Sequence, residues 1–93
     1  MENMNWVVAQ AEVDGDVEYV TTFEVVQQFA TFDEATNWAL ADVGGPHPML
    51  YMEDWELESG NTVMEYNDGN GKNYCVYHVN DEEAAKDFMQ RNF

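Results

Sequence analysis

The chain has 93 residues, with 19 Asp and Glu against 3 Lys and Arg, which gives a formal net charge of −16. This is about twice the upper end of the net charge advised for a small soluble domain. It excludes direct binding to nucleic acid or to an anionic membrane, because both need many basic residues. The composition is 45% hydrophobic and 14% aromatic, so the chain has enough apolar mass to fold despite its self-repulsion. We expect one acidic domain over residues 1–93.

The sequence carries few signals for processing or export. Cys75 is the single cysteine, so an intrachain disulfide cannot form. No basic start followed by an apolar run is present, and no apolar stretch is long enough to span a membrane. These features predict a cytoplasmic protein with a reduced thiol.

The first third of the chain is predicted to form a β-hairpin. Residues 5–13 alternate in polarity as a strand does, and a second strand begins at Val17 and extends as far as Ala30. A three-residue loop brings the two apolar faces together. This register places Glu12 directly opposite Glu18.

A helix is predicted to follow this hairpin. Thr31 and Glu34 have the spacing of a capping box, and apolar residues then recur at helical spacing. Gly44 is a suitable residue to end the helix. The prediction is therefore a helix over residues 32–43.

The second half of the chain is predicted to contain three strands and a helix. A third strand starts near Met49, and a two-residue Gly60-Asn61 turn leads into a fourth strand. This register pairs Trp55 with Tyr66 and Glu56 with Glu65. Residues 72–79 form a fifth strand, and the pattern after Asn80 predicts a second helix.

The predicted fold class is α+β, with the order ββα-βββα. About five strands form an antiparallel sheet, and both helices pack on one face of it. Trp38 and Trp55 fall on apolar faces and are assigned to the core. Glu53 shares the face of Trp55, which is unusual for a charged residue and indicates a position near a sheet edge.

The face of the sheet opposite the apolar one is predicted to be acidic. Two like-charge pairs, Glu12 with Glu18 and Glu56 with Glu65, face each other across strands, an arrangement that normally destabilises a sheet. All 3 basic residues lie at or beyond Lys72, so none is near these acids in the sequence. The predicted partner-binding residues on this acidic face are Glu12, Asp14, Asp16, Glu18, Asp54, Glu56, Glu58 and Glu65.

Carboxylates repeated along a strand are similar in charge and spacing to a nucleic-acid backbone. In size, charge and composition the chain resembles the small phage-encoded DNA-mimic inhibitors, which include glycosylase-inhibitor, anti-restriction and acidic anti-CRISPR proteins. The resemblance implies a non-catalytic inhibitor, often dimeric, that blocks a basic nucleic-acid-binding protein of the host. It carries over no individual residue and names no target.

Other functions have weaker support in the sequence. Two alternatives remain: a general acidic module that binds a basic partner, and an acid-rich domain adapted for solubility. No metal or cofactor is expected, because His47, His78 and Cys75 lie in different predicted elements and the Asp-Gly segments are typical of turns. We find no constellation of catalytic residues, so the sequence does not predict an enzyme.

Overall fold

The computed structural model describes residues 3–14 and 20–90. Five strands form one antiparallel sheet with the order β2-β1-β5-β4-β3, which confirms the α+β class. The strands are β1 (Trp6–Asp14), β2 (Val20–Phe29), β3 (Tyr51–Glu56), β4 (Thr62–Asn67) and β5 (Asn73–His78). The helices are α1 (Phe32–Asp42), α2 (Glu82–Gln90) and a short 3₁₀ turn, η1 (Val79–Asp81).

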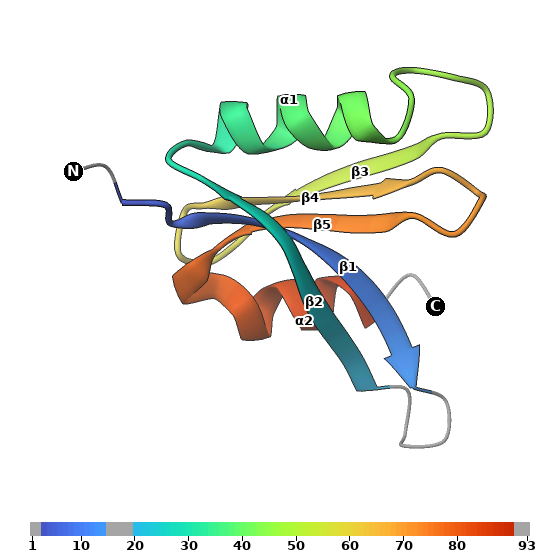
Figure 1. Ribbon diagram of the computed structural model, residues 1–93. Helices are drawn as coiled ribbons and strands as arrows, with labels where there is room; N and C mark the ends of the chain where they lie inside the picture. Colours follow the sequence, from blue (N-terminus) through green and yellow to red (C-terminus); the bar gives the residue numbers. More distant parts are fainter. Residues whose placement is uncertain (1–2, 15–19, 91–93) are drawn as a thin grey trace.

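The two helices lie on opposite faces of the sheet, so the prediction of one covered face is wrong (Figure 1). On β1, Val7 packs in a cluster with Phe88 and Met89 of α2, whereas Val8 packs in a cluster with Ala35 and Ala39 of α1. Neighbouring residues of a strand point to opposite faces, so both sides of β1 are buried. The apolar runs at the start of β1 (WVVA) and in the middle of β5 (YCVY) are continuous, as is typical of strands covered on both faces.

The register of the first hairpin differs from the predicted one. Ala11 lies opposite Phe23 and Glu12 opposite Thr22, which leaves residues 15–19 between the two strands. Over residues 9–14 the predicted and observed registers differ by an even number of residues, so both bring the same apolar faces together. Apolar matching cannot distinguish two such registers. A bulge between Val8 and Ala9 shifts the rest of the pairing by one residue.

The second hairpin is shifted by an odd number of residues, which exchanges the two faces of β3 relative to β4. Trp55 lies opposite Val63 and Glu56 lies opposite Thr62, so the predicted pairs of Trp55 with Tyr66 and Glu56 with Glu65 are wrong. The connection is closed by the Leu57 N–H, which donates to the Asn61 carbonyl at 2.8 Å. It is therefore longer than a two-residue turn.

Both ends of β3 are anchored in the core by leucines. Leu50 packs against the cluster beneath α1, and Leu57 packs against the cluster beneath α2. The strand between them is the last of the sheet, and five of its six residues are exposed. The contacts of the helices with the sheet are concentrated on the other four strands. The prediction that Glu53 lies near a sheet edge is confirmed.

The start of α1 agrees with the predicted cap. The Thr31 hydroxyl accepts a hydrogen bond from the Glu34 N–H at 3.1 Å, and the helix ends at Asp42, one residue before the predicted end. Gly44 follows with φ of +96°, a conformation that glycine adopts without strain. Ahead of α2, a ring nitrogen of His78 accepts from the Asn80 N–H at 3.2 Å and caps η1.

Candidate interaction surface

The acidic residues of the first hairpin do not form the predicted like-charge pair. Glu12 is exposed and lies opposite Thr22, whose hydroxyl donates to the Glu12 carbonyl at 3.4 Å. Asp14 is the last residue of β1. Asp16 and Glu18 lie outside the described residues. Because the backbone partner of Glu12 is Thr22, the predicted pairing with Glu18 is wrong.

The acidic residues of the second hairpin are divided between surface and core. Asp54, Glu56 and Glu58 are exposed, as predicted. Glu65 is only 2% exposed, and its neighbours across the sheet are Glu53 and Cys75. A buried carboxylate cannot contact a partner on the surface, so the assignment of Glu65 to the acidic face is wrong.

The two acidic groups are also far apart. Gln10, Tyr74, Tyr66 and Met52 form one row across the sheet. From this row Glu12 lies toward one end of the sheet and Glu56 toward the other, because β1 and β3 run in opposite directions. Standard strand spacings then separate their Cα atoms by roughly 25 Å. This exceeds the screening length of about 8 Å at physiological salt, so the groups act as separate surfaces.

The surface around β3 combines carboxylates with exposed apolar side chains. Tyr51 and Trp55 are each 49% exposed, and Met52 is 46% exposed. The predicted burial of Trp55 is therefore wrong, whereas Trp38 packs against the core as expected. We define the β3 edge surface as Tyr51, Met52, Glu53, Asp54, Trp55, Glu56 and Glu58.

The described basic residues are engaged away from this surface. The Lys72 ammonium lies 3.1 Å from Asp42, and the Lys86 ammonium lies 3.9 Å from Glu83 and 6.0 Å from the centre of the Phe23 ring. Within residues 3–14 and 20–90, no ion pair involves a carboxylate of the β3 edge surface. The surface therefore keeps its negative charge uncompensated by these lysines.

One carboxylate of the β3 edge surface is fixed by a neighbour. The Tyr51 hydroxyl donates to Glu53 at 2.8 Å. This hydrogen bond to an anion raises the pKa of Tyr51 above its ordinary value, with smaller contributions from desolvation and from the charges of Glu53 and Glu65. The phenol therefore remains neutral and holds the carboxylate along the strand.

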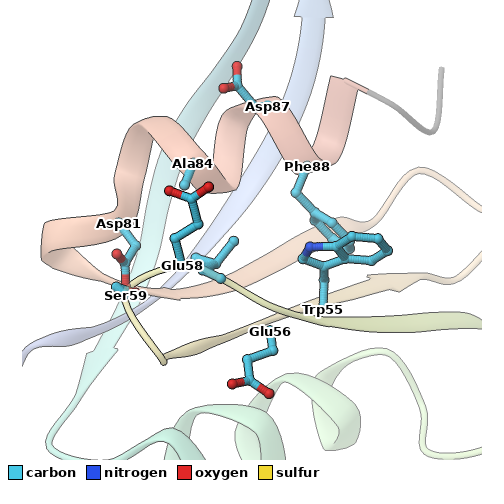
Figure 2. Close-up of a pocket in the computed structure, with 9 residues that line it drawn as sticks. Trp55, Glu56, Glu58, Ser59, Asp81, Ala84, Asp87 and Phe88 are labelled. Carbon is cyan, nitrogen blue, oxygen red and sulfur yellow. The ribbon is translucent and has the colours of Figure 1, made fainter.

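A groove adjoins the β3 edge surface, between the end of β3 and α2 (Figure 2). It has a volume of about 580 Å³. Its apolar lining comes from Trp55, Leu57, Ala84 and Phe88. Glu58 extends across the groove toward α2, whereas Glu56 points away from it (Figure 2).

Sequence reasoning missed the apolar part of this surface. Matching Trp55 to an apolar partner placed it in the core, although its strand is covered by neither helix along most of its length. The available signal was Glu53, since a charged residue between Tyr51 and Trp55 on one strand face is inconsistent with full burial.

The other candidate groups have structural roles. Cys75 is completely buried, and desolvation raises the pKa of its thiol well above the ordinary value, with a smaller contribution from Glu65. Such a thiol is a poor nucleophile. One ring nitrogen of His47 accepts from the Met49 N–H at 3.2 Å, and the other lies 3.2 Å from the Val43 carbonyl at the end of α1.

In residues 3–14 and 20–90, no three His, Cys, Asp or Glu side chains are grouped so that they could hold a metal ion. The helices of this part of the chain are all too short or too polar to cross a membrane.

Comparisons with known proteins do not assign the chain to a class. No protein-family model, curated protein or solved structure matches it.

Proposed function

We propose that the protein is a non-catalytic inhibitor that binds a basic nucleic-acid-binding protein of a host cell, in the cytoplasm, and blocks its nucleic-acid site. The observation that carries this proposal is the β3 edge surface. There, exposed carboxylates without an ion-pair partner among the described residues lie beside exposed aromatic and Met side chains. A phosphate-binding surface supplies the opposite charge.

The charge supports fast and salt-sensitive association. A net charge of −16 attracts a basic surface over distances of about a Debye length, and this attraction weakens as salt is added. Asp54 and Glu56 are alternate residues of one strand, so they point to the same face at a spacing of about 6.8 Å. They present charge in the manner of successive phosphates along a backbone.

The apolar side chains favour a protein partner over a role in solubility alone. Aromatic and Met side chains are enriched in the buried centres of protein interfaces, where they supply much of the binding energy. Met52 lies on the same face of β3 as Asp54 and Glu56, whereas Tyr51 and Trp55 lie on the opposite face with Glu53. A domain that is acidic only for solubility has no reason to expose them together.

The proposal is tested by competition for a captured target. The protein is immobilised, exposed to a cell lysate at about 50 mM salt and washed with a DNA duplex. Nucleic-acid-binding proteins should be captured, released by the duplex, and released by salt at a few hundred millimolar. A purified target should then lose DNA binding in a gel-shift assay as the acidic protein is added.

Two charge-matched variants locate the surface. Asp54→Lys with Glu56→Lys should weaken capture at least tenfold, because both side chains are exposed on β3. Glu24→Lys with Asp33→Lys changes the net charge equally on β2 and α1, also at exposed positions, and should weaken capture much less. Equal weakening by both pairs would show that only net charge matters, as in a general acidic module. A target that binds DNA and this protein together would refute the proposal.

A further inference from the structure

We infer that the groove between the end of β3 and α2 receives an arginine side chain of the protein partner. This inference rests on the proposed function, since it names the chemistry by which a basic partner is recognised. The groove differs from the flat acidic surface beside it because it joins an exposed indole, an apolar lining and carboxylates in one concave site.

The apolar lining suits a guanidinium group on an aliphatic stem. Trp55 is 49% exposed and lines the groove together with Phe88 (Figure 2). Leu57 also lines it. A guanidinium is weakly hydrated and stacks on an indole face through cation–π attraction, while its methylenes cover apolar surface. An ammonium is more strongly hydrated and gains less from such a wall.

Carboxylates supply the complementary charge. Glu58 extends across the groove toward α2, and Asp81 lies at its end near Ser59 (Figure 2). Asp81 is 8% exposed, and one of its carboxylate oxygens accepts a hydrogen bond from the Asn61 side-chain amide at 2.9 Å. A carboxylate that is already held by a hydrogen bond loses little conformational entropy when it binds a guanidinium group. Carboxylates can accept two parallel hydrogen bonds from a guanidinium.

The charges argue against other occupants. An apolar side chain would desolvate the exposed Glu58 carboxylate without pairing it, which is unfavourable. A second copy of the chain brings a further net charge of −16 and has only 3 basic residues, so repulsion opposes its docking. An arginine from a basic partner can stack on the indole and pair with a carboxylate at the same time.

The inference is tested with small probes and no target protein. The probes are acetyl-arginine methylamide, its citrulline counterpart, which is a neutral isostere, and acetyl-lysine methylamide. Each is titrated into the ¹⁵N-labelled protein while the three tryptophan indole resonances are followed by NMR. The Trp55 indole is assigned from a Trp55→Phe spectrum, and Trp6 and Trp38 serve as internal references, because they pack against the core.

Binding should be saturable at the Trp55 indole for the arginine probe. We expect it to be about tenfold tighter than for citrulline, which corresponds to one charge-assisted contact. It should be about threefold tighter than for the lysine probe, because the stacking is lost. Glu58→Gln should weaken arginine binding at least threefold, and the exposed control Glu24→Gln should leave it unchanged.

Three outcomes would overturn the inference: no saturable shift, equal shifts for arginine and citrulline, or equal affinity for arginine and lysine. The result is independent of the capture experiment. If the probe binds but no nucleic-acid-binding target is found, the proposed function fails and the groove remains an arginine site. If a target is captured and the probe does not bind, the recognition lies elsewhere on the surface.

Discussion

Strands β5 and β3 have the same length and opposite environments. Five of the six residues of β5 are buried, whereas five of the six residues of β3 are exposed. Both strands carry aromatic residues, and Tyr74 is 6% exposed while Tyr51 is 49% exposed. The difference follows from position in the sheet, since β5 lies at the centre between the two helices and β3 lies at the edge (Figure 1).

The side chains that stabilise the fold and the side chains that are exposed lie on different strands of one sheet. Side chains on β5 contact both core clusters, so they hold the fold together. The side chains at the middle of β3 contribute little burial, and the strand is anchored mainly by its pairing with β4 and by the leucines that flank it. The β3 edge surface can therefore carry unfavourable charge and exposed aromatic groups at small cost to stability.

The largest expected effect contrasts two methionines. Met89 of α2 is 0% exposed and packs against the central strands, whereas Met52 of β3 is 46% exposed. Met89→Ala should lower the free energy of unfolding by about 3 kcal/mol, because it removes a buried side chain and leaves a cavity. Met52→Ala should lower it by less than about 1 kcal/mol. Urea denaturation followed by circular dichroism measures both, and equal losses would contradict the assignment of β3 as a peripheral strand.

A smaller effect is expected from two tyrosine hydroxyls. Tyr74 of β5 donates to Asp42 at 2.5 Å, and Tyr51 of β3 donates to Glu53 at 2.8 Å. Removing a half-buried bond to a carboxylate should cost about 1.5 kcal/mol for Tyr74→Phe. The exposed Tyr51→Phe should cost less than about 0.5 kcal/mol. Thermal and urea unfolding of the two variants give the comparison directly.

The pH dependence provides a control for the Tyr74 variant. Desolvation, followed by the hydrogen bond to Asp42, raises the pKa of Tyr74 to about 12 from an ordinary value of 10.0. Between these values the unfolded chain loses this proton before the folded chain does, so stability falls as the pH rises. Tyr74→Phe should therefore lose less stability than the parent over this interval. An identical alkaline loss would show that Tyr74 is not the group responsible.

The sequence predicted most of the elements because local signals determine them. The Thr31 cap, the helical stripes and the apolar strands all lie within short windows, and the structure confirms the five strands and two helices that they indicate. The placement of the helices on opposite faces depends on contacts between distant segments. Because Val7 and Val8 are both apolar, the pattern of β1 does not reveal which face each helix covers.

The candidate site was predicted only in part, and the reason is strand register. Asp54, Glu56 and Glu58 are exposed as expected, whereas Glu65 is buried. Pairing apolar residues with apolar residues assumes that both strands face a core, and the edge position of β3 removes that condition. The groove was beyond sequence reasoning because its two walls, α2 and the end of β3, are joined only in the folded chain.

The smallest expected effect is on Glu56, and it tests the register itself. In the predicted register Glu56 faces Glu65, so Glu56→Lys would replace a repulsion by an attraction and stabilise the protein by up to about 1 kcal/mol. In the structure Glu56 is exposed and faces Thr62, so the substitution should change the free energy of unfolding by less than about 0.5 kcal/mol. Urea denaturation at low and at moderate salt resolves the two cases, because a cross-strand attraction would fade as salt is added. A salt-sensitive gain in stability near 1 kcal/mol would support the predicted register instead, with a two-residue turn and Trp55 opposite Tyr66. Little change at either salt concentration would instead leave Glu56 available to a partner, since its charge then contributes almost nothing to the fold.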